Sequence, residues 1–151
     1  EEREYLEAAS LLHEIGFGIS HSSHHKHSYY IIRNSELMVG FNFDEIEIIA
    51  LVARYHRKSP PKPKHIEFNK ISPASQLTVK KLSAIIRIAD GLDWSHQGIA
   101  EGVSCELQND IVVFKVRAKK NVDPHIDIWS AHQKKDLFEE VYGKKCAFVV
   151  I

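Results

Sequence analysis

The sequence predicts a mainly α-helical fold, with a helical domain over residues 1–98 and a small α+β domain over residues 99–151. Apolar residues recur at helical spacing in the first part, and the period changes from helix to strand near residue 100. The chain is 44% hydrophobic and 26% charged, as is typical of a soluble globular protein. Its 151 residues suffice for one domain or two small ones.

The first elements are two helices separated by a polar loop. Apolar residues at helical spacing predict a helix over residues 1–15, and Gly16 ends it. A loop rich in histidine and serine follows over residues 17–28. A short helix is then expected over residues 28–35.

The next helix has the clearest start signal in the chain. Asn42 followed three residues later by Glu45 is typical of a capping box. We expect the helix to present His56 near its C-terminus, and the segment 59–63, which contains three prolines, to end it. The predicted inner face consists of Ile46, Ile49, Ala50, Val52 and Ala53.

A loop then continues to about Pro73, followed by a long helix over residues 75–92. Apolar residues at helical spacing define its expected buried stripe. The members of this stripe are Leu82, Ile85, Ile86 and Ala89.

The α+β domain is expected to contain a hairpin over residues 102–119, with its turn at Asn109 and Asp110. The apolar residues of 126–129 suggest a third strand. A helix should run from Ser130 through Tyr142, and residues 146–151 should form a final strand. We expect packing roles for Trp94, Trp129, Phe138 and Tyr142.

Charge and cysteine content narrow the classes of function. Lys+Arg and Asp+Glu number 20 each, so net charge predicts no polyanionic partner. Basic residues nevertheless cluster over 54–64 and 115–120, which indicates either solvated faces or an anion-binding surface. Two distant cysteines form neither a disulfide framework nor a zinc knuckle, and they fit a cytoplasmic protein.

The sequence has no signal peptide and no apolar run long enough to span a bilayer, so we expect no membrane partner. It lacks an initiator methionine and opens inside a helical pattern. We therefore expect a fragment of a longer protein.

Several histidines and acids lie at or near the ends of predicted helices. His13, Glu14 and Asp90 could supply one nitrogen and two carboxylates to a metal ion. A second group could complete this shell or surround a phosphate, and consists of His25, His27 and His56. The alternative is that such residues are surface or capping groups, as we expect for His21, His24, His65, His96, His125 and His132.

The strings that carry these residues resemble a known family. LLHEIG followed by IRIADGLD is similar to the HD phosphohydrolase superfamily. More narrowly, LLHEIGFGISHSSHHKHSYYIIRNSELMVGF, ARYHRKSPPK and LSAIIRIADGLDWSH resemble the C-terminal HD-like region of the exopolyphosphatase and guanosine pentaphosphate phosphohydrolase (Ppx/GppA) family. The resemblance covers residues 5–98, and it implies an HD-like helical bundle followed by a small α+β domain.

The resemblance implies a division of labour in the parent protein. Removal of phosphate from polyphosphate or guanosine pentaphosphate would belong to N-terminal actin-like domains that use Mg²⁺, and this chain would hold no catalytic residue. The region would contribute a homodimer contact and a basic channel for a long polyanion.

The HD-like site departs from the superfamily pattern. Catalytic HD proteins have a further histidine on a helix upstream of the HD pair, and this sequence begins too late to contain it; Glu14 also replaces the usual aspartate beside His13. Because ligand number and geometry set metal affinity, we expect no tightly bound metal at His13, Glu14 and Asp90. One alternative is a self-sufficient, metal-dependent HD phosphohydrolase acting on a nucleotide or phosphate ester, and another is a non-catalytic dimerisation module.

A polyphosphate chain resembles a nucleic-acid backbone without bases, so Lys and Arg should bind it without reading sequence. We therefore expect no sequence-specific nucleic-acid partner. The predicted anion-binding residues are Lys26, Arg54, Arg57, Lys58, Lys62 and Lys64.

Overall fold

The computed structural model describes residues 1–151 and contains two compact units, Glu1–Ile86 and Arg87–Ile151. Seven α-helices and one three-stranded sheet confirm the predicted fold class, mainly α with a small α+β part. The division falls within the long helix α5 (Pro73–Leu92), twelve residues before the expected domain boundary at residue 98. The last turn of α5 belongs to the second unit because Gly91 lies against Ala131 there.

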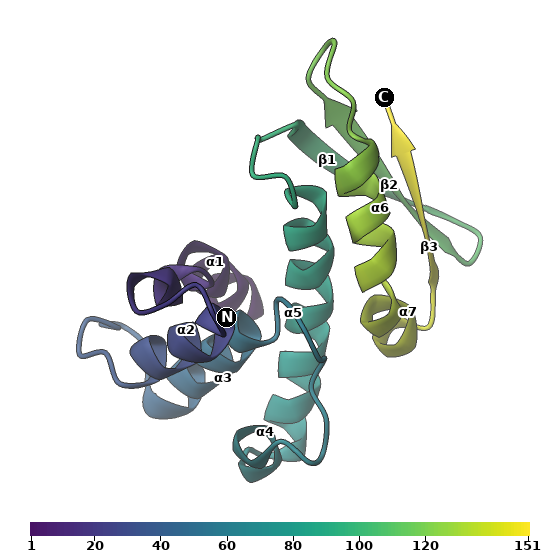
Figure 1. The fold of residues 1–151 in the computed structure, drawn as a ribbon. Coiled ribbons are helices and arrows are strands. Elements are labelled where there is room, and N and C mark those ends of the chain that lie inside the picture. The colour runs from purple at the N-terminus through teal and green to yellow at the C-terminus, as the bar shows by residue number, and fades with distance from the viewer. The chain divides into compact units, whose positions relative to one another are not determined.

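In the first unit, α2 packs against α3 and against a short 3₁₀ helix, η1, and α1 also packs against α3 (Figure 1). The centre of the core is α3, where every residue from Ile48 to Ala53 is buried. The elements besides α5 are α1 (Glu2–Leu12), η1 (Ile15–Gly18), α2 (His24–Arg33), α3 (Phe43–Arg54) and α4 (Ile66–Lys70).

The predicted capping box at the start of α3 is confirmed. The Asn42 side chain accepts hydrogen bonds from the backbone N–H groups of Asp44 and Glu45, at 3.0 and 3.1 Å. The Glu45 carboxylate accepts the Asn42 N–H at 2.8 Å. Tyr5 of α1 donates its hydroxyl to the same carboxylate at 2.9 Å, so the cap also ties two helices together. All five residues of the predicted inner face are buried.

Two helices of the first unit differ from the prediction. α2 begins at His24 instead of near Ser28, because His24 and His25 are buried and form its first turn. The expected loop before α5 contains α4, which is anchored by the buried Phe68. On α5 itself, Leu82 and Ile86 are buried as predicted, whereas Ala89 is exposed.

The second unit is built on a sheet of order β1-β2-β3 (Figure 1). β1 (Ala100–Gln108) and β2 (Ile111–Ala118) form the predicted hairpin, and β3 (Lys145–Val150) pairs with β2 in parallel. Phe114 and Phe148 stack on one face of the sheet. Phe138 and His132 pack against these rings, so the helices α6 and α7 cover that face.

The predicted third strand over residues 126–129 is wrong, because this segment belongs to α6 (His125–Lys134). α7 (Asp136–Tyr142) follows directly. The buried residues of α6 are Asp127, Ser130 and Ala131, and the Asp127 carboxylate accepts the Ser95 N–H at 2.7 Å. This segment therefore forms a helix despite its strand propensity, because the helix allows a polar contact and a close contact between small residues.

The expected packing residues divide into two groups. Phe138 is buried in the second unit, as predicted. Trp94 and Trp129 are each about half exposed, at 52% and 51%, and Tyr142 is 36% exposed, so these three are not interior anchors. No helix combines the length and the apolar character that crossing a bilayer requires.

Candidate functional site

A buried pair of histidines organises the polar part of the first unit. His24 opens α2, and His56 follows the end of α3, with their Nε2 atoms 3.2 Å apart. The His56 Nδ1 atom lies 2.6 Å from the Ala53 carbonyl, which can only accept, so Nδ1 carries the proton. His56 Nε2 is then the acceptor, and His24 Nε2–H donates to it.

The position of the proton on His24 also determines how Arg57 contacts this ring. The Nδ1 atom of His24 lies 3.0 Å from Arg57 Nη1, which can only donate, and 3.3 Å from the His21 carbonyl, which can only accept. With the proton of the neutral ring on Nε2, Nδ1 accepts from Arg57, and the longer His21 contact is not a hydrogen bond. Burial, followed by the nearby Arg57 charge, lowers the pKa of His24 and keeps the ring neutral. Phe17 stacks on the other side of this imidazole, at 4.0 Å between ring centroids. The series of hydrogen bonds that joins His56, His24 and Arg57, called the relay below, thus holds the Arg57 guanidinium in a set orientation.

His24 is therefore not the surface residue that the sequence predicts, since it is only 3% exposed. His65 is also partly covered, and Tyr55 stacks on it at 5.5 Å. The Lys62 N–H donates to His65 Nδ1 at 3.3 Å, which leaves the His65 proton on Nε2. Neither residue carries a sequence signal, because each histidine is placed by tertiary packing.

A cavity of about 400 Å³ lies in the first unit beside this relay. Its lining brings together four residues of the predicted site, His25, Lys26, Arg54 and Lys58. None of the eight lining side chains is acidic. The other four, which sequence reasoning missed, are Ser23, Tyr55, Ser59 and His65.

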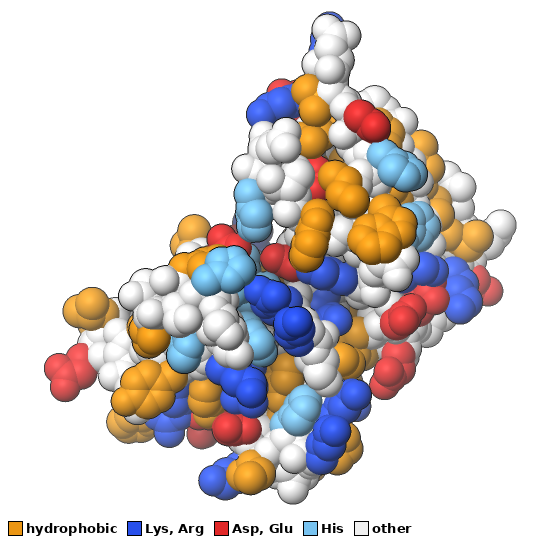
Figure 2. Space-filling view, in the orientation of Figure 1, with side chains coloured by type: hydrophobic (Ala, Val, Ile, Leu, Met, Phe, Trp, Pro, Cys, Tyr) orange, Lys and Arg blue, Asp and Glu red, His pale blue; other side chains and the backbone are white.

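The cavity lining carries positive charge, and a nearby carboxylate balances part of it. Arg54 forms an ion pair with Glu67 at 3.4 Å and lies over the Tyr29 and Tyr55 rings. Lys26 and Lys58 are exposed at the protein surface. Figure 2 shows Lys and Arg side chains beside histidines on this face of the first unit. The cavity therefore favours an anionic ligand.

The remaining predicted residues lie outside the lining. Lys62 and Lys64 are exposed in the segment between α3 and α4. His27 is half-buried on α2, and its Cβ lies close to Gly16. Arg57 points to His24, as described. The predicted anion-binding set is thus spread over the cavity, the relay and an exposed loop.

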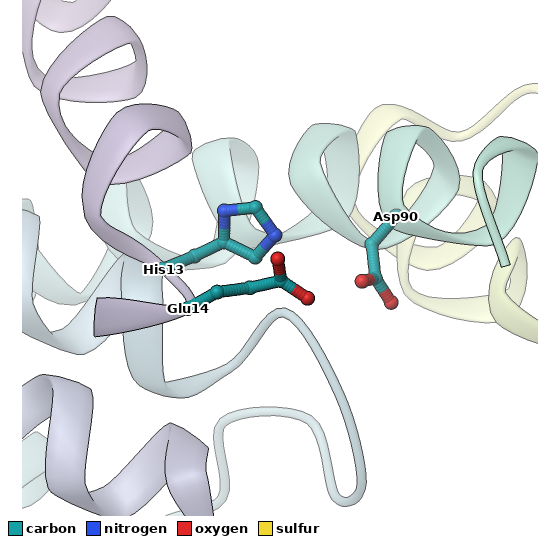
Figure 3. A group of neighbouring side chains, drawn as sticks. All are labelled: His13, Glu14 and Asp90. Atoms are coloured by element: carbon teal, nitrogen blue, oxygen red, sulfur yellow. The ribbon is translucent and has the colours of Figure 1, made fainter. Parts of the chain in front are cut away.

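His13 and Glu14 follow the end of α1 in the first unit, and Asp90 lies in the last turn of α5 in the second unit (Figure 3). The His13 Nδ1–H donates to the Ser10 carbonyl at 2.7 Å, so the free electron pair of the ring is on Nε2. Ser28 donates its hydroxyl to the His13 carbonyl at 2.6 Å and accepts the Gly16 N–H at 3.0 Å. These bonds fix the end of α1.

Asp90 forms an ion pair with Lys134 of α6 inside the second unit. An ammonium group in contact with this carboxylate competes with a cation for the same oxygen atoms. Lys134 therefore already balances the charge of the Asp90 carboxylate, which makes Asp90 a weaker metal ligand.

Acidification should destabilise the first unit through His25. Burial, aided by Arg57, lowers the pKa of His25 from 6.5 to about 4. Between these values the unfolded chain binds a proton that the folded chain does not, so stability is full above pH 6.5 and is lost as pH falls toward 4. The expected loss from pH 7 to pH 5 is about 2 kcal/mol. Urea denaturation at both pH values measures it, and His25→Leu should lose less; an equal loss in both proteins would contradict this assignment.

Two comparisons show which known proteins this chain is similar to. The family model described as Ppx/GppA phosphatase, domain III, matches residues 1–138. A guanosine-5'-triphosphate,3'-diphosphate pyrophosphatase from Pseudoalteromonas translucida (strain TAC 125) is 39% identical over 84 residues. The match covers 56% of this chain and 16% of that relative, so the chain spans a small part of the relative's length.

Proposed function

Because this chain belongs to the Ppx/GppA phosphatase family, we propose that it is the C-terminal accessory portion of a cytoplasmic phosphohydrolase of that family. In this proposal it contributes anion binding and homodimerisation, and the catalytic centre lies in other domains of the parent. Mg²⁺ would act in those N-terminal domains. The substrate reached through the parent is polyphosphate or guanosine pentaphosphate, the latter suggested by the name of the relative.

The observation that carries the proposal is the cavity of the first unit. It places Lys26, Arg54 and Lys58 around one recess with no acidic side chain in its lining. A phosphate chain is bound mainly through such cations, because their attraction does not depend on sequence or on base edges. The exposed Lys62 and Lys64 extend this basic surface along the chain.

A filter-binding assay with long polyphosphate tests the proposal on this chain. We expect retention at low salt that excess unlabelled polyphosphate removes, while a neutral polymer of similar length does not compete. Absence of retention at low salt would contradict anion binding. Sedimentation over a range of protein concentrations tests the homodimer, and a monomer at every concentration would contradict that part.

The alternative is a self-sufficient HD phosphohydrolase with a metal ion at His13, Glu14 and Asp90. A metal ion would activate a water molecule there. The ion pair between Asp90 and Lys134 argues against it, because the carboxylate already has a cationic partner. A dimerisation module without anion binding would leave the cationic cavity unexplained.

Elemental analysis after purification without chelators distinguishes these alternatives. We expect less than about a tenth of an equivalent of Mn, Fe, Ni or Zn, since a site with few ligands binds weakly. One equivalent of any of these metals, lost in a His13→Ala variant, would instead support the HD phosphohydrolase. A Lys134→Gln variant serves as a matched probe, because it frees the Asp90 carboxylate.

A further inference from the structure

β3 lies at one edge of the sheet in the second unit, so one side of its backbone pairs with β2 and the other side faces outward (Figure 1). The N–H groups of Lys145 and Ile151 donate inward, to the carbonyls of Asp110 and Val116. Alternate residues of a strand direct these groups to opposite sides, so Phe148 and Val150 direct theirs outward. Such an edge is a template for pairing with another strand.

The Glu139 side chain sets the point at which this free edge begins. The Cys146 N–H also faces outward, and it donates to the Glu139 carboxylate at 2.9 Å. Lys135 and Lys145 hold that carboxylate, at 2.6 and 3.1 Å. The first outward donor of β3 is therefore already used, and the part of the edge left for another strand contains Phe148 and Val150.

The two edges of the sheet differ in the features that prevent strand pairing. β1, at the opposite edge, carries Glu101 and Glu106 and has an irregular register between Ala100 and Gly102. Residues 146–151 contain no charged residue, no proline and no glycine. Charges and bulges are the usual protection of natural edge strands, so β3 is the unprotected edge.

Apolar side chains accompany this unprotected edge. Val149 and Val150 are 45% and 47% exposed, and Ile151 is 65% exposed. Phe148 packs on His132 of α6, so Val149 and Ile151 lie on the opposite face of the sheet. A strand placed alongside β3 would bury these side chains as well as pair with the backbone.

We propose that β3 pairs in antiparallel fashion with β3 of a second copy of this chain, which joins the two sheets into one. The two-fold axis passes beside Val149, because this register pairs Phe148 of each copy with Val150 of the other and uses the outward groups that Glu139 leaves free. This inference rests on the proposed homodimerisation and assigns a specific surface to it.

The edge is complementary to a second copy of itself. In this register Val149 lies opposite its own equivalent, and Ala147 lies opposite Ile151, so apolar residues meet apolar residues and no like charges face each other. The contact is isologous, and it leaves only the protected β1 edges outside. Assembly therefore ends at two copies instead of continuing into a fibre.

A cysteine cross-link tests the register. Opposed residues that exchange no hydrogen bonds have Cα atoms about 4.5 Å apart, within reach of a disulfide. Val149→Cys, in the whole chain with the exposed Cys105 replaced by serine, should form a linked dimer under mild oxidation. Val150→Cys is the matched control, equally exposed but opposite Phe148, and it should cross-link at least about tenfold more slowly. Equal rates in the two variants would overturn the proposal.

A proline substitution tests the backbone contact. Val150→Pro removes an outward N–H and leaves the inward hydrogen bonds of β3 in place. We expect sedimentation to show self-association that is weaker by about tenfold or more. Val150→Thr keeps the N–H and the branched shape, so it should stay within about threefold of the wild type. A proline variant that is folded by circular dichroism and still associates like the wild type would contradict the proposed pairing.

Amide hydrogen exchange on the wild-type protein needs no variant. The Phe148 and Val150 N–H groups should exchange at least about tenfold more slowly at concentrations where the dimer predominates than in dilute protein. The Val149 N–H faces β2 and should be slow at both concentrations. A dimer in which Phe148 and Val150 stay fast would refute this surface alone, whereas a monomer at every concentration would refute the proposed homodimerisation as well.

Discussion

Replacing Gly16 with alanine should destabilise the first unit by about 3 kcal/mol. A Cβ at this position would lie 2.1 Å from the His24 carbonyl oxygen and 2.6 Å from the Ser28 backbone nitrogen. Both atoms belong to the backbone of α2, so relief requires the helix itself to move. Thermal unfolding followed by circular dichroism should show a midpoint lower by about 10 °C.

Gly18 provides the matched control for this experiment. It lies in the same 3₁₀ helix, two residues later, and an added Cβ there would meet nothing within 4 Å. Gly18→Ala should therefore leave the midpoint within about 2 °C of the wild type. Equal midpoints for the Gly16 and Gly18 variants would show that α2 does not approach η1 as closely as described.

Removing two charges from the cavity should weaken long polyphosphate binding about tenfold. The variant is Lys26→Gln with Lys58→Gln, two residues that line the recess from different elements. Each lost cation also removes a contact that displaces counterions, so the salt dependence should become shallower. Affinity measured by filter binding at fixed low salt gives the effect directly.

Its control removes the same net charge elsewhere. Lys70 and Lys120 are exposed and do not line the cavity. Lys70→Gln with Lys120→Gln should change affinity by less than about threefold, through the long-range field alone. An equal loss in both double variants would mean that net charge, and not the cavity, determines binding.

Local sequence signals predicted the elements whose stability is local. The reciprocal cap of Asn42 and Glu45 marks the start of α3, and the turn at Asn109 and Asp110 marks the hairpin. Both signals consist of residues that satisfy backbone groups close to them in sequence. The fold class followed from these elements and from the change of apolar period.

The segments that were misread depend on contacts distant in sequence. α6 buries Asp127 and Ala131 against Ser95 and Gly91, so its inner face carries no apolar stripe to read. Its exposed Ile126 and Trp129 instead suggested a strand. α2 likewise begins with histidines, whose burial is decided by packing and not by a cap signal.

The sequence predicted which residues line the cavity better than it predicted how they are arranged. His25, Lys26, Arg54 and Lys58 meet in the cavity, as a basic and histidine-rich motif suggested. The role of Arg57 as a partner of His24 could not be read from spacing, because 33 residues separate the two. Which nitrogen carries each proton follows only from carbonyl and guanidinium neighbours in space.

The salt dependence of polyphosphate binding to the wild-type chain tests the central claim most directly. A polyanion held by three or more cations should lose affinity steadily as salt rises, with a slope of log K against log salt of about −2 or steeper. Measurements between roughly 50 and 200 mM salt cover the useful range. A slope of this size would support a polyanion-binding accessory region. Binding that is absent at the lowest salt, or independent of salt, would contradict it.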